Sequence, residues 1–380
     1  MPRHGFESRS RLRVVRLAHG ILIALLLTSI SACTFMHGAR LDKISLPAGF
    51  SISMYKDNVP NARTLAFGEK GTLFVGTYKA GKVYAIPEPN GHQGDVLVIA
   101  EGLQNPHGVA FRNGSLYVAE RGRILRFDDI ENHLTRPLAP TVVYDLGLKY
   151  AHHGLRVMHF GPDGKLYVSI GVPCNICMPE ADRYGVIIRI DGSGKAEVFA
   201  RGIRNSVGYD WHPQTHELWF TDNGRDLLGN DAPPDELNHA PVAGMHFGYP
   251  YCHAGELSDP VFGLRNPCSE FKGPVQRLGP HVAALGMRFY TGHQFPASYR
   301  NRVFIAEHGS WNRSPKLGYR ITMVTLAGNE AVKYEPFAEG WLQGNSAWGR
   351  PADVIVAPDG ALLVSDDKLG AIYRISYGTP

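Results

Sequence analysis

Short apolar strands recur along this chain, and each follows a tight turn. The turns lie near residues 71, 114, 164, 215, 301 and 360. The clearest copies of turn and strand are 68–75, 112–118, 162–168 and 358–364, and two looser copies are 212–220 and 299–305. Spacings of 43, 50 and 51 residues between the first four turns are close to the length of a β-propeller blade.

A second pattern follows four of these strands and predicts their hairpin partners. It is a glycine turn followed by alternating apolar and polar residues, at 81–86, 122–127, 185–190 and 370–375. Such alternation predicts a strand with one buried face. No segment after residue 32 keeps a 3.6-residue apolar period, so we expect few helices. We therefore predict an all-β fold, a six-bladed β-propeller with four antiparallel strands per blade; a seventh blade would need a repeat that the sequence does not show.

The long gap between the turns at 215 and 301 holds an insertion rich in Gly, Pro and Tyr. Two of the cysteines that we expect to pair, Cys252 and Cys268, lie in it, and we predict that it reaches the face carrying the site. The other predicted pair is Cys174–Cys177. Its Cys-x-x-Cys spacing also fits redox or metal chemistry, but no second such motif accompanies it, which favours a structural bridge. The Cys252–Cys268 bridge would contribute roughly 3 kcal/mol by chain entropy.

The N-terminus resembles a bacterial lipoprotein signal. A head with five arginines is followed by the apolar run 21–27 and then by Cys33. We expect residues 1–32 to be the signal, 33–44 a linker and 45–377 the catalytic propeller domain. Acylation of Cys33 would anchor the protein to the membrane in the periplasm. A plain cleaved signal and an uncleaved anchor are the alternatives, although the run is short for a permanent span.

Composition and charge indicate a globular protein and argue against one class of partner, nucleic acid. Hydrophobic residues make up 44% of the chain and charged residues 19%, which is typical of a globular protein. The formal net charge of +4 falls to about zero without the leader. Nucleic acid is therefore not an expected partner, since phosphate binding needs a retained basic surface.

Polar residues stand in one phase of the repeat and predict a shared pocket. His152, Arg204, Asn205 and Arg350 each precede a repeat turn by roughly ten residues. In a propeller, loops in the same phase converge on the central channel. His152 is then a candidate general base, and Arg204 offers a planar fork suited to a carboxylate. Taken singly, a histidine pair is more often a hydrogen-bonding feature of a loop, and an arginine a surface ion pair.

Two further stretches add ligands to this pocket. Residues 221–226 and 231–238 are rich in oxygen ligands and turns, which suits Ca²⁺, although the spacing is not that of an EF-hand. Residues 307–313 are too polar for a buried strand and supply another cation. Several arginines and a histidine that face one channel imply an anionic ligand.

These residues together resemble the soluble quinoprotein glucose/sorbosone dehydrogenase family, and its sorbosone dehydrogenase-like branch in particular. The resemblance covers nearly all of residues 45–377. Its most specific parts are His152 to Arg156 running into 160–168, then 202–205, 247–250, 308–313 and 349–354.

The resemblance implies a six-bladed propeller that holds pyrroloquinoline quinone (PQQ) with Ca²⁺ over the channel. His152 would take the proton of the substrate hydroxyl while hydride passes to a quinone carbonyl. Arg204 and Asn205 would contact the carboxylates and ring oxygens of PQQ, and Arg350 a further carboxylate. Main-chain carbonyls of Gly224 and Arg225 would ligate Ca²⁺, which acts as a Lewis acid.

This chain departs from the glucose enzymes at several of these positions. Ala151 stands where an acidic residue often precedes the catalytic histidine, and Ala352 follows Arg350 where a second arginine is expected. Arg313 or His308 would replace a cofactor-contacting lysine. Gln104 or His107 would replace a cofactor-facing glutamine.

The main hypothesis is a PQQ-dependent dehydrogenase that oxidises a sugar, such as an aldose, sorbosone or a related polyol or aldehyde, and passes electrons to a quinone or a cytochrome. One alternative is a Ca²⁺-dependent lactonase or esterase, in which His152 activates water. The other is an envelope binding protein without catalysis.

Overall fold

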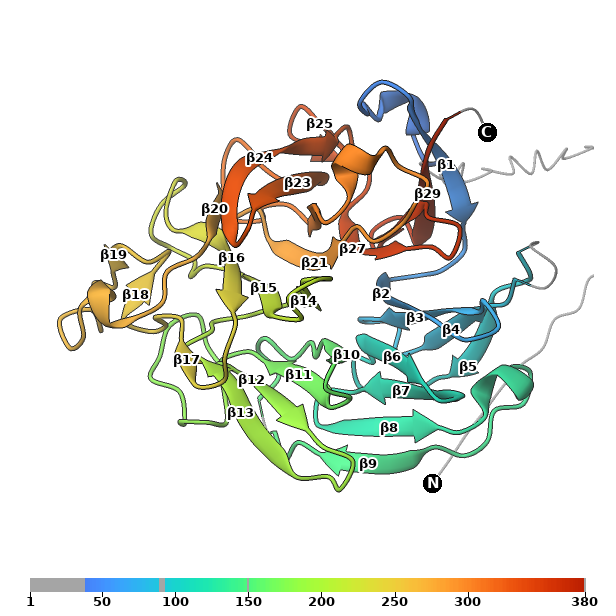
Figure 1. The fold of residues 1–380 in the computed structure, drawn as a ribbon, viewed down its shortest axis with the longest axis horizontal. Helices are drawn as coiled ribbons and strands as arrows, with labels where there is room; N and C mark the ends of the chain where they lie inside the picture. The colour runs from blue at the N-terminus through green and yellow to red at the C-terminus, as the bar shows by residue number, and fades with distance from the viewer. Residues whose placement is uncertain (1–37, 89–92, 149, 379–380) are drawn as a thin grey trace, which may run out of the picture. The chain divides into compact units, whose positions relative to one another are not determined.

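Six sheets of four or five strands are arranged around a common centre, as Figure 1 shows. The computed structural model describes residues 38–88, 93–148 and 150–378. The innermost strand of each sheet lies nearest the centre, and these strands are β2, β6, β10, β14, β21 and β27. Each sheet is a blade, so the prediction of a six-bladed propeller is confirmed.

The first two blades consist of four consecutive strands each. The first blade is β2 (Ala62–Phe67), β3 (Leu73–Thr77), β4 (Val83–Ile86) and β5 (Leu97–Ala100). The second blade is β6 (Gly108–Arg112), β7 (Ser115–Ala119), β8 (Arg123–Phe127) and β9 (Thr141–Asp145).

The third and fourth blades share the inserted segment. The third blade is β10 (Met158–Phe160), β11 (Leu166–Ile170), β12 (Val186–Ile190) and β13 (Ala196–Arg201), with β17 (Met245–His246) as a fifth strand. The fourth is β14 (Gly208–Trp211), β15 (Leu218–Asp222), β16 (Pro234–Ala240) and β20 (Gln276–Pro280). Strand β17 pairs with β13 in parallel, so this blade departs from the predicted four antiparallel strands.

The fifth and sixth blades complete the ring. The fifth is β21 (Ala284–Phe289), β22 (Val303–Glu307), β23 (Arg320–Ala327) and β24 (Glu330–Ala338). The sixth is β27 (Pro351–Val356), β28 (Leu362–Asp366) and β29 (Ala371–Tyr377), with β1 (Phe50–Lys56) on its outer edge. Because β1 pairs antiparallel with β29, the two ends of the described chain close the ring within one blade, blue beside red in Figure 1.

The repeat turns seen in the sequence join the first strand of each blade to the second. Gly71, Gly114, Gly164 and Gly360 each have a φ between +73° and +90°. This left-handed region is strained for residues with a Cβ, so glycine marks the turn in four of the six blades. Asn301 adopts the same region with φ +60°, and asparagine tolerates it better than most residues.

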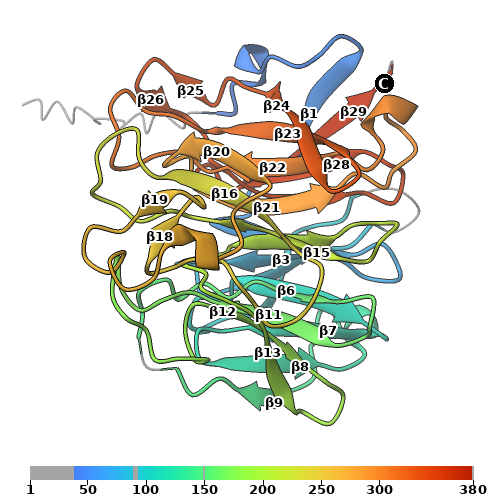
Figure 2. The same cartoon turned by 60° about the vertical axis from the view of Figure 1, so that its left-hand side comes forward.

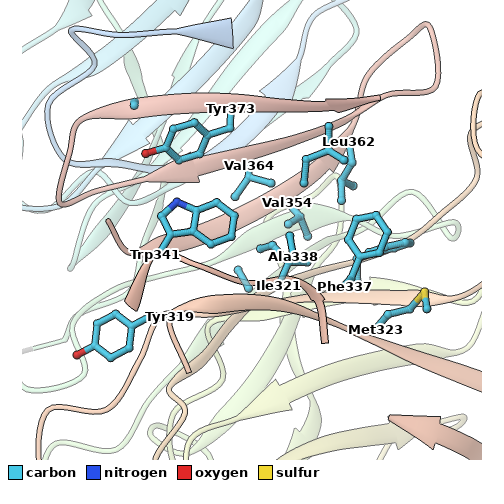
Figure 3. Packing of buried hydrophobic residues seen from close by; sticks show 14 of the residues in the cluster. Tyr319, Ile321, Met323, Phe337, Ala338, Trp341, Val354, Leu362, Val364 and Tyr373 are labelled. Carbon is cyan, nitrogen blue, oxygen red and sulfur yellow. The ribbon is translucent and has the colours of Figure 1, made fainter. Parts of the chain in front are cut away.

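Apolar side chains fill the spaces between neighbouring blades. One cluster joins the fifth and sixth blades, with Ile321, Phe337, Trp341, Val354 and Tyr373 almost completely buried. Figure 3 shows these side chains meeting between the two sheets. Strands β3, β11, β15, β22 and β28 are buried at every position, so both faces of these strands are covered.

The insertion between β16 and β20 carries a two-stranded ribbon, β18 (Cys252–His253) with β19 (Leu257–Ser258). The ribbon lies near β16 and β20 in both Figure 1 and Figure 2. Both predicted disulfides are present, Cys174–Cys177 and Cys252–Cys268. A second short ribbon, β25 (Leu342–Gln343) with β26 (Ser346–Ala347), precedes the sixth blade.

Helices are few, as predicted. The helices within the described ranges are short 3-10 turns: Leu41–Lys43, Ile130–Asn132, Cys268–Glu270 and Ala297–Tyr299. Among these residues, no helix has the length and apolar character needed to cross a bilayer. The predicted lipoprotein signal at 1–32 and the acylated Cys33 lie outside the described residues.

Candidate functional site

Loops from several blades converge on one cavity of about 360 Å³, which we call the central cavity. They are the loops that enter the innermost strands and the loops that follow the second strands. We call the side of the propeller that bears these loops the entry face. The residues of the central cavity used below are Arg63, Tyr78, His153, Arg204, Asn205, Gly224, Asp226, Asp235, His308, Trp311 and Asn312.

A carboxylate at the end of the second strand holds the entry loop in three blades. In each case it accepts hydrogen bonds from main-chain N–H groups just before the innermost strand. The pairs are Glu120 with Gln104 (2.6 Å), Asp222 with Arg204 (2.8 Å) and Asn205 (2.6 Å), and Asp366 with Arg350 (2.9 Å). For Arg204, Asn205 and Arg350, the shared phase seen in the sequence is therefore a shared main-chain position.

The guanidinium of Arg204 is buried and fully engaged. Its Nε donates to the carbonyl of Asn175 (3.0 Å), and its Nη1 donates to the carbonyl of Asn223 (3.1 Å). Its Nη2 donates to Oδ1 of Asn175 (2.9 Å) and pairs with Asp226 (3.0 Å). These contacts fix the direction of the side chain rather than leave it free to swing.

Glycine is required at the turn just before Arg204. Gly202 has φ +70°, and a Cβ there would lie 2.3 Å from the ring of His246 in the insertion. The insertion therefore packs directly against the turn that presents Arg204 and Asn205. Asn205 itself lines the central cavity, and its side chain makes no hydrogen bond within the described part of the chain.

The two histidines before β10 lie side by side, with ring centroids 4.1 Å apart. His153 lines the central cavity, and its Nδ1 lies 2.9 Å from the carbonyl of Val172. His152 is more exposed. Burial and the nearby Arg204 lower the pKa of His152, although Asp226 opposes them. Burial lowers the pKa of His153 to about 2. Both rings are thus neutral near pH 7.

An ion-pair cluster in the wall of the cavity was predicted only in part, because His308 was named from the sequence but Arg63 and Asp367 were not. Arg63 pairs with Asp367 (2.6 Å), which also contacts Nε2 of His308 (2.8 Å). Burial raises the pKa of Asp367, but Arg63 and His308 outweigh it and hold that pKa well below its usual range. The sequence carried a signal for Arg63, because it lies eight residues before the first repeat turn at Gly71.

Arg350 lies at the entry to β27 and lines a second cavity next to the central one. Its Nε donates to the carbonyl of His308 (3.1 Å) and its Nη2 to that of Gly309 (3.0 Å). The guanidinium also lies over the ring of Tyr319, 5.5 Å from its centroid. Arg350 therefore shares an environment with His308, which itself lines the central cavity.

The loop after β15 brings Gly224 to the cavity wall, followed by the buried Arg225. The N–H of Gly224 donates to Asp235 (2.9 Å), and Arg225 pairs with Asp259 of the insertion (2.5 Å). The carbonyl oxygens of Gly224 and Arg225 accept no hydrogen bond from the described residues. Burial raises the pKa of Asp235 to about 7, against the hydrogen bonds that it accepts.

The predicted site residues His152, Gln104 and Arg313 line neither the central nor the second cavity. Gln104 lines a separate cavity of about 480 Å³ and accepts a hydrogen bond from Arg121 (3.1 Å). Arg313 lines neither the central nor the second cavity and pairs with Asp231 (3.0 Å). His107, the alternative to Gln104, is buried with its Nδ1 3.3 Å from the carbonyl of Arg156, and burial lowers its pKa to about 3.

Asn175 is a residue that sequence reasoning missed. It lies between the disulfide-bonded Cys174 and Cys177 and makes hydrogen bonds with both Arg204 and Asp226. No local pattern marks an asparagine in a long loop as the partner of an arginine 29 positions later.

The comparisons with known proteins agree on one family. A family model described as Glucose / Sorbosone dehydrogenase matches residues 141–374. An uncharacterized protein of Borreliella burgdorferi is 32% identical over 92% of this chain and 94% of its own length. A pyrroloquinoline quinone-dependent pyranose dehydrogenase of Coprinopsis cinerea is 28% identical over 88% of this chain. The match spans 54% of that fungal protein, about half of its length.

Solved structures share the fold at low sequence identity. The holo form of the PQQ domain of the Coprinopsis cinerea pyranose dehydrogenase has a TM-score of 0.73 at 18% identity, covering 88% of this chain and 97% of that one. A calcium structure of the Trichoderma reesei carbohydrate-active enzyme of family AA12 has a TM-score of 0.79 at 18% identity, with the same coverage. With the family match over more than half of the chain, the likeness leads to one conclusion: this chain belongs to the glucose/sorbosone dehydrogenase family.

Proposed function

We propose that this protein is a dehydrogenase that oxidises a sugar with PQQ and Ca²⁺, and that His152 is its general base. The observation that carries the proposal is the central cavity, which combines arginine, asparagine and histidine side chains on the entry face of a propeller of this family. A cavity of about 360 Å³ is within the usual range for a small organic ligand.

Unused hydrogen-bonding capacity in the cavity walls fits an anionic, oxygen-rich ligand. The buried Nε of Arg63 has no partner in the described structure, and neither does Oδ1 of Asn312. The side chain of Asn205 is also without a partner there. Buried polar atoms are nearly always paired, so the atoms of Arg63 and Asn312 favour a ligand that supplies an acceptor and a donor. PQQ is a tricarboxylate with ring carbonyls and a ring N–H, and it meets both needs.

The carbonyls of Gly224 and Arg225 fit a calcium ion. Carbonyl oxygens are hard ligands of the kind that Ca²⁺ takes in flexible geometry. No cluster of three or more His, Cys, Asp or Glu side chains in the described ranges is arranged to hold a metal. Main-chain oxygens, completed by water and the cofactor, are therefore the ligands that we propose.

Each side chain then has a distinct task. Asn205, Arg63 and Arg350 would bind and orient the cofactor, and Arg204 would add its charge to the same wall. His152, kept neutral near pH 7 by burial and by Arg204, would accept the proton of the sugar hydroxyl or aldehyde hydrate. When bound, PQQ supplies the acceptor for the two electrons and the hydrogen of the C–H bond, and Ca²⁺ supplies Lewis acidity.

Reconstitution tests this proposal directly. Protein made without PQQ should reduce an artificial electron acceptor with an aldose only after PQQ and Ca²⁺ are both added, and a chelator should remove the activity. Asn205→Ala should weaken PQQ binding at least about tenfold without loss of folding, because its side chain has no internal partner. Asn329→Ala, in an exposed turn, is the matched control.

Three other outcomes would contradict the dehydrogenase proposal, and each would point to a different conclusion. No dye reduction across a sugar panel, with no change in the PQQ absorption spectrum, would sink the dehydrogenase proposal. Lactone hydrolysis without PQQ would favour the hydrolase, and binding of sugar without any reaction would favour the binding protein. Export and a lipid anchor at Cys33 remain part of the proposal, to be tested by fractionation of cells that express the Cys33→Ala variant.

A further inference from the structure

A second cavity of about 560 Å³ adjoins the central one on the entry face. The two cavities share Arg63, Tyr78 and Trp311 in their walls. Further walls of the second cavity come from the loops after β3, β22 and β28 and from the entry to β27. The two cavities are therefore adjacent, with Trp311 in the walls of both.

The second cavity is strongly positive. Its walls contain five cations, Arg63, Lys79, Lys316, Arg350 and Lys368. The one carboxylate among the described lining residues is Asp367, and it is already paired with Arg63 and with His308. Asp366 and Asp367 also act on the charge of Arg350, so an uncompensated positive charge can come only from the three lysines, Lys79, Lys316 and Lys368.

The three lysines have no acidic partner in the described structure. No ion pair involves Lys79, Lys316 or Lys368 there, whereas Lys82 and Lys333 do form such pairs. The amines of Lys79 and Lys316 lie over the rings of Tyr78 and Tyr319, 5.7 Å and 5.9 Å from the centroids. Cation–π contacts place these amines without neutralising them, so their charge remains available to an anion.

An exposed aromatic ring separates the two cavities. Trp311 lines both, and 70% of its surface is exposed. A single exposed aromatic side chain is common on protein surfaces, but this one lies in the walls of two adjoining polar cavities. The C–H face of a pyranose ring is a flat, weakly apolar surface that would cover it.

We propose that the second cavity binds the carboxylate-bearing unit of an acidic saccharide, with Lys79, Lys316 and Lys368 around the carboxylate and Trp311 beneath the sugar ring. The inference rests on the proposed function, because the sugar end to be oxidised would lie in the central cavity. It names the substrate class: a uronic acid or a short oligosaccharide that contains one. Arg63 and Arg350 remain available to the cofactor.

Binding to the whole protein without added PQQ tests the site separately from catalysis. We would titrate digalacturonate and cellobiose by calorimetry and by Trp fluorescence. The protein should bind digalacturonate at least about tenfold more tightly than cellobiose at low salt, and the preference should shrink near 0.15 M salt, where charges are screened beyond about 8 Å. The variant Lys79→Gln/Lys316→Gln/Lys368→Gln should lose the preference. Lys195→Gln/Lys272→Gln/Lys333→Gln removes the same charge at exposed lysines outside the second cavity and should keep it.

Comparing the affinities for PQQ and for digalacturonate shows which of the two ligands supplies the carboxylate that the lysines bind. PQQ affinity unchanged in the first triple variant supports the proposal. Loss of PQQ affinity with unchanged digalacturonate binding would overturn it and assign the lysines to the cofactor. Equal binding of the two sugars by the unmodified protein would also overturn it. Tight digalacturonate binding by a protein that never binds PQQ would keep this site and reject the dehydrogenase. Trp311→Ala, which removes an exposed side chain, should weaken both sugars.

Discussion

The imidazole of His152 lies beside that of His153, and it is the less buried of the two. The Nδ1 of His153 lies next to the carbonyl of Val172, and burial holds the pKa of His153 far below the ordinary value of a histidine. A base must be unprotonated before the reaction and must accept a proton during it. His152 meets both conditions, because its pKa is lowered to a lesser degree and it is more accessible to a substrate.

Replacing His152 should remove the base. His152→Ala is expected to lower kcat of the reconstituted enzyme at least about a hundredfold, with PQQ affinity nearly unchanged. His153→Ala, one position away, should have the smaller effect on kcat. If His153→Ala gives the larger loss, the base is His153.

The pH profile of kcat/KM tests the same assignment. Burial and Arg204 lower the pKa of His152 below its ordinary 6.5, so the base form persists as the pH falls. We expect the acid limb of the profile to have its midpoint below 6.5. A midpoint above 6.5 would contradict the assignment.

At the scale of elements, the loop between β11 and β12 fixes the direction of Arg204. Cys174 and Cys177 close this loop, and Asn175 between them accepts two hydrogen bonds from Arg204. Asn175 also accepts from the N–H of Asp226 (2.8 Å). The hydroxyl of Tyr249, from the insertion, accepts a hydrogen bond from the N–H of Cys177 (3.0 Å). One loop thus connects the insertion to the wall of the central cavity.

Loss of the Asn175 side chain should loosen Arg204. Asn175→Ala leaves one Nη2 bond of Arg204 and the N–H of Asp226 without this acceptor. We expect PQQ affinity to fall about tenfold or more, the scale of one lost hydrogen bond to a charged group. Asn175→Asp, which keeps an acceptor at Oδ1, should restore most of the affinity. Affinity equal to that of the unmodified protein in Asn175→Ala would show that Arg204 is held without it. Calorimetric titration with PQQ is the measurement.

At the scale of the whole molecule, closure of the ring joins the ends of the described chain. Strand β1 is the outer strand of the sixth blade, although it precedes the first blade in sequence. Phe50 begins β1 and makes edge-to-face contacts with Phe295, Phe337 and Tyr377, with ring centroids 4.7 to 5.0 Å apart. It therefore connects the closing blade to the fifth blade.

Phe50→Ala should destabilise the whole propeller. The loss of a large aromatic side chain from packed surroundings costs roughly 3 kcal/mol, so the urea midpoint of unfolding should fall clearly. Val332→Ala removes a residue that is 59% exposed on β24 and should change the free energy of unfolding by less than about 0.5 kcal/mol. Similar midpoints for the two variants would mean that β1 does not stabilise the closed ring.

Much of the fold and part of the site could be read from local patterns. The repeat turns are visible because glycine is needed at a positive φ, and the strands because alternation with period two buries one face of a sheet. The shared position of Arg204, Asn205 and Arg350 within the repeat could also be read from the sequence, because each lies a similar distance before a repeat turn and therefore just before an innermost strand. The side chains of Gln104 and Arg313 could not be placed in this way, because phase locates the main chain and not the direction of the side chain.

The sequence by itself determined the six blades, both disulfides, the family resemblance and the loops on which the candidate site lies. Each of these depends on turn chemistry, strand periodicity or motifs confined to a short stretch of chain. The tertiary structure alone decided which of those loops share a cavity, that Asn175 holds Arg204, that Arg63 joins the wall, and that three lysines from separate blades surround a second cavity. Those contacts join residues from different blades, and their geometry depends on how the blades pack around the centre.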